Sequence, residues 1–163
     1  MKVTQTATYA LAPSDVLAIL AAQEFQEEKC RATYAESFEA SVTESGSSTV
    51  VTTARSMPTE HLPDVARGFI GNSLTIHETQ TWTGPDAAGG YTADLKLHVQ
   101  GAPMTGSGRR TLSPDGNGGS TDNIAVEIKA SIPLIGRRIE EMAAPMVSAA
   151  AEIETELLKA RSR

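Results

Sequence analysis

Residues 135–157 read IGRRIEEMAAPMVSAAAEIETEL, and this stretch decides the fold. Its apolar residues recur at spacings of three and four, which places them along one narrow arc of a helix. A helix with one apolar stripe has to lie against another layer, and most of the chain before it has the pattern of strands. The sequence therefore predicts a long C-terminal helix packed on a sheet, with room for a ligand between them. The stripe consists of Ile135, Ile139, Met142, Met146, Ala150, Ile153 and Leu157.

Pro145 stands inside this predicted helix. Proline has no amide hydrogen, and its ring crowds the carbonyl four residues earlier, here that of Glu141. We therefore expect either a kink near Glu141, or a short helix that ends there and a main helix that starts at residues 144–146. We interpret the charged residues of this segment as one solvated face. They are Glu140, Glu141, Glu152, Glu154, Glu156 and Lys159.

The preceding residues predict one strand, two short helices and six further strands. Val3 to Tyr9 alternates and is rich in threonine, which favours a strand. Ser14 is a candidate cap for the first helix, and the second helix is expected from about Gln23 to Arg31. The segment Met57 to Ile70 contains prolines and is interpreted as a loop or one helical turn. The six later strands are centred on residues 38–42, 49–55, 74–82, 91–99, 104–112 and 124–132.

Composition limits the classes of function. A chain of 163 residues fits one domain, residues 1–163, and buries roughly 70% of its extended surface. The net charge of -6 and the lack of a long basic cluster argue against nucleic acid and anionic membranes as partners. Cys30 is the single cysteine, so no intrachain disulfide or cysteine zinc site is expected, and a cytoplasmic location fits best. No run has the length of a signal peptide or a membrane span.

The order of elements resembles the helix-grip fold of the START-like superfamily, which includes polyketide cyclase/dehydrase and lipid-transport proteins. The resemblance covers essentially the whole chain. Two shorter runs, Met57-Pro58 to Leu62-Pro63 with Arg67-Gly68-Phe69 and Ile132-Pro133-Leu134-Ile135-Gly136 to Ile139-Glu140, are similar to an actinobacterial family of unknown function within it. The resemblance implies an α+β fold with a seven-stranded curved antiparallel sheet around the C-terminal helix.

Strand parity predicts which side chains face a cavity between sheet and helix. If Leu74 and Ile76 face the helix, Glu78 and Gln80 do so as well, and Arg110 shares a face with Met104 on a later strand. Glu78 and Arg110 would then hold an acidic or hydroxylated ligand, or pair with each other. Alternatively, they lie in water at the rim, or a bulge at Gly106-Ser107-Gly108 breaks the parity. The predicted cavity residues are Leu74, Ile76, Glu78, Gln80, Trp82, Leu95, Leu97, Arg110, Met142 and Met146.

The sequence contains no metal or nucleophile signature. His77 and His98 fall on the polar faces of their strands, His61 lies in the proline-bounded segment, and no two histidines have ligand spacing on a helix. No serine stands in a Gly-x-Ser-x-Gly setting, and Cys30 is interpreted as a packing or surface thiol. We expect no catalytic residues, no metal and no cofactor.

These observations favour binding of a small hydrophobic or amphipathic ligand, such as a lipid or a polyketide-like molecule, over catalysis. The turns at Met57 to Ile70 and Gly101 to Thr105 are candidate gates of the cavity. One alternative is an aromatase/cyclase-type enzyme in which Glu78 or Arg110 promotes enolisation of a bound polyketide. Another is a packed module without a cavity that serves in protein–protein contact. A homodimer is left open.

Overall fold

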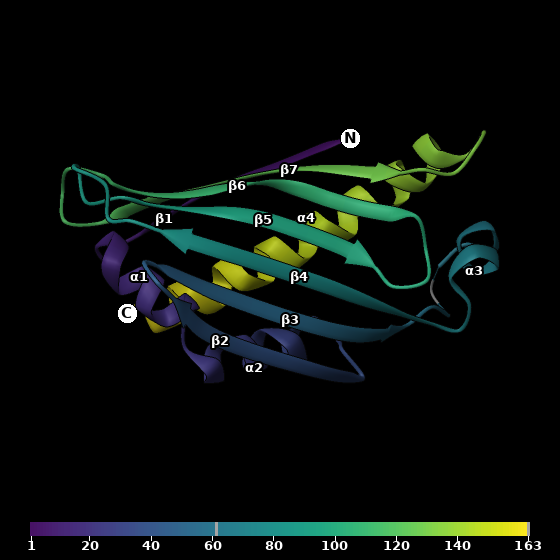
Figure 1. Ribbon diagram of the computed structural model, residues 1–163, viewed down its shortest axis with the longest axis horizontal. Coiled ribbons are helices and arrows are strands. Elements are labelled where there is room, and N and C mark those ends of the chain that lie inside the picture. The colour runs from purple at the N-terminus through teal and green to yellow at the C-terminus, as the bar shows by residue number, and fades with distance from the viewer. Residues whose placement is uncertain (61, 163) are drawn as a thin grey trace.

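The computed structural model describes residues 1–60 and 62–162. These residues form one curved sheet of seven strands in the order β1-β7-β6-β5-β4-β3-β2, with every neighbouring pair antiparallel (Figure 1). They also form four helices. The strands are β1 Lys2–Tyr9, β2 Ser37–Ser45, β3 Ser48–Pro58, β4 Ser73–Thr83, β5 Tyr91–Val99, β6 Met104–Pro114 and β7 Ser120–Ala130, and the helices are α1 Pro13–Leu20, α2 Gln23–Ala32, α3 Asp64–Ile70 and α4 Gly136–Arg161.

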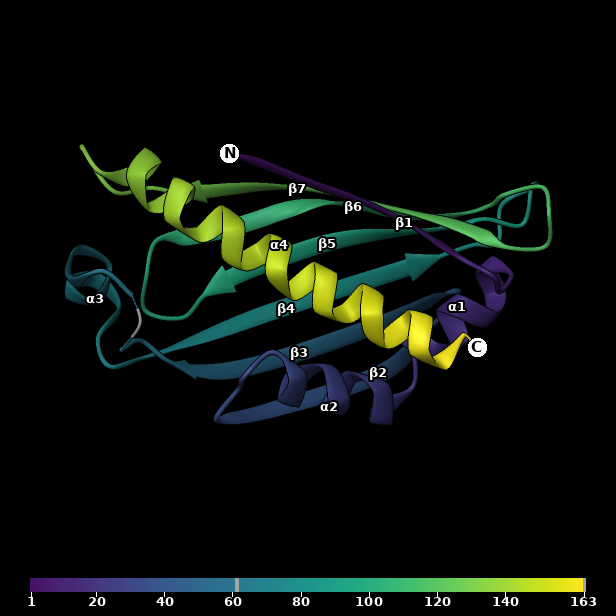
Figure 2. The ribbon, with the colours of Figure 1, turned by 180° about the vertical axis from the view of Figure 1, so that it is seen from behind.

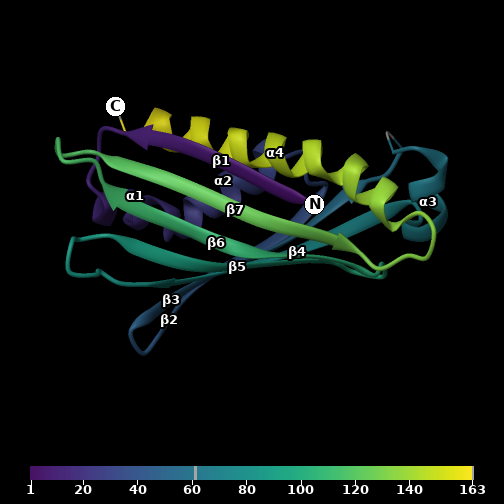
Figure 3. The same ribbon diagram turned by 90° about the horizontal axis from the view of Figure 1, so that it is seen from above.

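Helix α4 crosses one face of the sheet diagonally, from the end near α3 to the end near α1 (Figure 2). Helices α1 and α2 lie on the same side, and none of the helices formed by residues 1–60 and 62–162 lies on the other face of the sheet (Figure 3). An antiparallel sheet with one covered face alternates apolar and polar side chains, as β5 and β7 do. The arrangement confirms the α+β helix-grip fold that the sequence predicted.

The main core lies where α1, α2 and the C-terminal part of α4 meet the sheet. Its largest fully buried apolar side chains are Trp82, Phe25, Leu20, Leu112 and Leu158. A smaller cluster joins α3, the end of β7 and the start of α4 through Ala66, Ala130 and Ile139. These apolar contacts hold α4 near both of its ends.

Two short helices differ from the expectation. Helix α1 begins at Pro13 after the N-cap residue Ala12, and no side chain caps it, so the prediction that Ser14 is the cap was wrong. Proline suits the first helical position because its φ angle is already helical and its missing amide hydrogen would have no partner there. The segment Met57 to Ile70 contains the seven-residue helix α3, which is longer than the single turn predicted.

Helix α4 is continuous over 26 residues with Pro145 inside it, so the prediction of two separate helices was wrong. Proline removes one hydrogen bond, and packing of Ile139 and Leu158 near the two ends fixes the remaining turns. The buried side chains of the second half are Glu154, Thr155 and Leu158, whereas Ile153 and Leu157 are half-buried. Glu154 is therefore buried, and the prediction that it lies on a solvated face was wrong.

The strand pairing through Gly106 and Gly108 is uninterrupted, so the alternative of a bulge was wrong. Gly108 pairs with Leu95 of β5 and with Val126 of β7, in the same register as the residues around it. A Cβ atom on Gly108 would overlap the carbonyl oxygen of Ala125, so glycine permits a close approach of β6 to β7. Because the register is kept, Arg110 faces the same side as Met104.

Candidate functional site

A cavity of about 370 Å³ lies between the inner face of the sheet and helix α4. Residues of α2, α3, β3 to β7 and α4 line it. Its size falls in the usual range for small-molecule sites, and most of its wall is apolar. The inner face of a curved sheet and a helix that spans it therefore enclose space between them.

Nine of the ten side chains predicted for the cavity line it. Met142 and Met146 contribute from α4, and Met146 is also 43% exposed. Trp82 is the exception, because it is fully buried in the main core beyond the cavity. The other lining residues among the ten are Leu74, Ile76, Glu78, Gln80, Leu95, Leu97 and Arg110.

The cavity wall changes from apolar to charged along each element. Strand β4 begins beside α3 with Leu74 and Ile76 and continues with Glu78 and Gln80. Strand β6 runs from Met104 to Arg110 in the same direction along the cavity, and α4 runs from Ile139 to Glu154. The apolar part of the cavity therefore lies near α3. Charged side chains close the end farthest from α3, which we call the inner end.

Six charged side chains form one continuous row at this inner end. Carboxylates and cations alternate along it, in the order Asp122, Arg110, Glu154, Lys29, Glu78 and Arg55. The row joins β7, β6, α4, α2, β4 and β3, and every member except Asp122 lines the cavity. Three negative and three positive charges make the row neutral, which is what burial of ionised groups requires.

The Asp122 end of the row is saturated with hydrogen bonds. Arg110 donates from Nε and Nη2 to the two oxygens of Asp122 at 3.0 and 2.7 Å, and the Tyr9 hydroxyl donates to Asp122 at 3.3 Å. Arg110 also donates to Glu154 at 2.5 Å and lies over the ring of Trp82, 5.7 Å from its centre. Burial alone would lower the pKa of Arg110, but Glu154 and Asp122 raise it. Each of the three nitrogens of this guanidinium therefore donates a hydrogen bond to a carboxylate.

The middle of the row is held by Lys29, which lies 2.8 Å from Glu154 and 3.0 Å from Glu78. Burial would raise the pKa of Glu78, but Lys29 and Arg55 lower it to about 2. The Gln80 amide donates to Glu78 at 2.8 Å and accepts the indole N–H of Trp82 at 3.1 Å. Glu78 is therefore an ionised, oriented carboxylate at neutral pH.

Glu78 and Arg110 do not contact each other directly, because Lys29 and Glu154 stand between them in the row. A general acid needs a pKa near the working pH, and the pKa of Glu78 lies far below it. Arg110 has its charge compensated by two carboxylates. Both residues that the aromatase/cyclase alternative requires are therefore held in ion pairs with the protein's own side chains.

The comparison with known families covers nearly all of the chain. A family model described as "Protein of unknown function (DUF2505)" matches residues 4–161. The chain belongs to the DUF2505 family.

Two mycobacterial proteins are related to it. Rv0481c of Mycobacterium tuberculosis (strain ATCC 25618 / H37Rv) and Mb0491c of Mycobacterium bovis, both described as uncharacterized, are 30% identical over 105 residues, which is 64% of this chain. The match spans about 60% of the length of these curated relatives.

Solved structures share the fold of this DUF2505 chain. The protein TTHA0849 from Thermus thermophilus matches with a TM-score of 0.62 and 14% identity, over 99% of this chain and 97% of that one. The Zhui aromatase/cyclase from Streptomyces sp. R1128 matches with a TM-score of 0.60 and 13% identity, over 99% of this chain and 93% of that one. The human StarD13 lipid transfer and protein localization domain matches with a TM-score of 0.60 and 13% identity, over 98% of this chain and 76% of that one. At these identities the likeness shows the fold alone, and it confirms the START-like resemblance.

Four members of the charged row were absent from the residues predicted from the sequence of this DUF2505 chain. The parity rule that found Glu78 would also have found Arg55, which alternates with Val51 and Thr53 on β3, and Asp122, which alternates with Ile124 on β7. Lys29 and Glu154 carry no such signal, because a charged residue on an amphipathic helix is ordinarily solvated. Only the packing of α2 against α4 brings these two together.

His77 and His98 are not members of the charged row, although His98 is among the residues that line the cavity. His77 and His98 are cross-strand partners on the polar side of β4 and β5, with stacked rings 4.4 Å apart. His61 lies outside the described residues. Within residues 1–60 and 62–162 no group of three or more histidine, cysteine, aspartate or glutamate side chains has the arrangement to hold a metal ion. In the same part of the chain, no helix is both long and apolar enough to cross a membrane.

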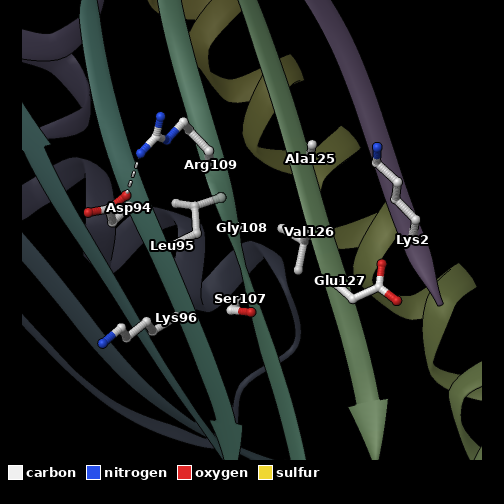
Figure 4. Close-up of a pocket in the computed structure, with 10 residues that line it drawn as sticks. All are labelled: Lys2, Asp94, Leu95, Lys96, Ser107, Gly108, Arg109, Ala125, Val126 and Glu127. Carbon is white, nitrogen blue, oxygen red and sulfur yellow. Dashed lines mark ion pairs between the residues drawn. The ribbon is translucent and has the colours of Figure 1, made fainter.

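A second pocket of about 520 Å³ lies over β5, β6 and β7, around Gly108 (Figure 4). Arg109 of β6 and Asp94 of the neighbouring strand β5 form an ion pair of 3.6 Å in its lining, and both side chains are about two-thirds exposed. Exposed ion pairs contribute little, and water competes for every polar group there. The cavity beneath α4 is the better candidate site, because its wall is mostly apolar and it ends on the buried charged row. The remaining residues that line this second pocket are Lys2, Leu95, Lys96, Ser107, Ala125, Val126 and Glu127.

Proposed function

We propose that this protein binds a small hydrophobic or amphipathic molecule, of lipid or polyketide-like character, in the cavity between sheet and α4. The observation that carries the proposal is a mostly apolar cavity that ends on a buried, fixed row of charges. Each 100 Å² of hydrocarbon surface removed from water contributes about 2.5 kcal/mol. A ligand that fills the apolar part therefore binds without further polar contacts.

The ligand would enter at the α3 end. The cavity wall there includes Leu62, Ile70, Met104 and Thr105, from the two segments Met57 to Ile70 and Gly101 to Thr105. Both consist mainly of connections between strands of the sheet, so they can move without breaking most of the strand pairing. The opposite end is filled by the main core around Trp82.

The proposal is tested with N-phenyl-1-naphthylamine, a neutral apolar dye whose fluorescence rises when it leaves water. We expect saturable 1:1 binding to the protein. Ala150→Phe places a ring in the cavity from α4, and Ala160→Phe places the same ring on an exposed part of that helix. The first variant is expected to lose dye binding and the second to keep it. Absence of saturable binding, or equal binding by both variants, would contradict the proposal.

Of the two alternatives, the packed module requires a filled interior, and the cavity argues against it. The aromatase/cyclase alternative lacks a suitable proton donor in Glu78. A single domain over residues 1–163, a cytoplasmic location and a homodimer remain predictions, and the proposed binding role depends on none of them.

A further inference from the structure

We infer that the ligand carries a carboxylate or similar anionic head that binds Arg55, with its apolar tail extending toward α3. This inference rests on the proposed binding function and names the chemical class of the ligand. It follows from the asymmetry between the two ends of the charged row.

An alternating row with equal numbers of charges has one negative and one positive end. At the negative end, Asp122 accepts two hydrogen bonds from Arg110 and one from Tyr9. It does not line the cavity. The negative end is therefore satisfied by the protein and is turned away from the ligand.

The positive end is left open. Arg55 is 4% exposed and lines the cavity, yet its guanidinium makes one hydrogen bond to Thr33 at 2.9 Å and one contact of 3.4 Å to Glu78. Its Nε has no hydrogen-bond partner among residues 1–60 and 62–162. A guanidinium has five N–H donors, and leaving them unused while buried is unfavourable. Arg55 can therefore accommodate an additional acceptor.

A planar anion suits this position better than a hydroxyl or an ammonium. A carboxylate accepts two parallel hydrogen bonds from the fork of an arginine, whereas a hydroxyl accepts at a single point. An ammonium head would find both carboxylates at this end of the cavity, Glu78 and Glu154, already paired with Lys29. Glu78 is already paired with Lys29 and oriented by Gln80, so it keeps partners when Arg55 turns toward a ligand.

The direction of the tail follows from the cavity wall. Beyond Arg55 on β3 the next residue on the same face is Met57, and its neighbour on β4 is Leu74. Ile139 and Met142 of α4 line the cavity on the opposite side. A head at Arg55 therefore places the hydrocarbon chain in the apolar part of the cavity, with its free end toward α3.

The first experiment measures displacement of N-phenyl-1-naphthylamine by dodecanoate and by dodecan-1-ol, which have the same tail length. One charge-assisted hydrogen bond corresponds to about a tenfold change in affinity, so dodecanoate should bind about tenfold tighter or more. Arg55→Met should remove this preference and leave dodecan-1-ol within about twofold. Arg109→Met, the same substitution at an exposed position on the other face, should change neither affinity.

The outcomes separate the two proposals. Equal affinities of the two compounds, or an unchanged preference in Arg55→Met, would overturn the anionic-head inference while the binding function stands. Failure of the dye and of both compounds to bind would overturn both.

A second measurement uses the unchanged protein and therefore does not depend on folding of a variant. The carboxyl carbon of bound 1-¹³C-dodecanoate reports its ionisation by NMR. Contact with Arg55 should lower the pKa of the bound acid below that of the free acid, because a neighbouring cation favours the ionised form. A carboxyl buried elsewhere in apolar surroundings would show a raised pKa, and that result would overturn the inference.

Discussion

Arg110 donates a hydrogen bond of 2.5 Å to Glu154, and this pair joins the middle of the sheet to helix α4 with both side chains buried. Glu154 also lies 2.8 Å from Lys29 of α2. A single carboxylate thus links three elements. Burial would raise the pKa of Glu154, but Arg110 and Lys29 lower it, so Glu154 carries the charge that both cations require.

Glu154→Gln is expected to destabilise the protein by about 3 kcal/mol or more, because it leaves two buried cations with too little negative charge. Glu152→Gln, two residues away and exposed, should change the free energy of unfolding by less than about 0.5 kcal/mol. Urea unfolding of both variants measures the difference. Similar stabilities of the two would show that the row contributes nothing to α4 docking.

Stability is expected to fall in acid through Glu78. Its pKa is lowered in the folded protein from an ordinary 4.5 to about 2, so its contribution is complete above about pH 5 and is lost as the pH falls toward 2. A shift of this size corresponds to about 3 kcal/mol. Urea unfolding between about pH 7 and pH 3 should show the loss, and Glu78→Gln should show a smaller pH dependence. A flat profile for the unchanged protein would contradict the assignment.

Gly108→Ala is expected to destabilise the protein by about 2 kcal/mol or more, since the new Cβ would overlap the backbone of Ala125. Gly68→Ala provides the control, because a Cβ there meets nothing within 4 Å and the residue lies in α3. Alanine in a helix is favoured over glycine, so this control should be about 0.5 kcal/mol more stable. The test is thermal unfolding of both variants, and a tolerated Gly108→Ala would mean that β6 and β7 can separate freely.

Cys30 is expected to be unreactive in the folded protein. It is fully buried in α2, and burial raises the pKa of its thiol, so little thiolate forms and reagent has no access. Labelling by a thiol reagent near neutral pH should be about a hundredfold slower or more than in urea-unfolded protein. Rapid labelling without denaturant would indicate frequent local opening of α2.

Local patterns in the sequence were enough to establish the order of the elements and the apolar faces of the strands. Alternation along Tyr91 to Val99 and the stripe through Ile139 are local properties, because each residue's side is set by the period of its own element. The same alternation predicted that Glu78 and Arg110 lie on the face of the sheet toward α4. Successive side chains of a strand point to opposite faces whether or not they are charged.

The contacts of these inward charges depend instead on how distant elements pack. Lys29 and Glu154 are separated by 125 positions in the chain, and only the docking of α2 and α4 on the same face of the sheet brings them within 2.8 Å. Burial of a charge depends on whether an opposite charge from another element reaches it, which no single segment encodes. For the same reason the cavity, the closed Asp122 end of the row and the open Arg55 end arise from packing between elements rather than from the pattern of any one of them.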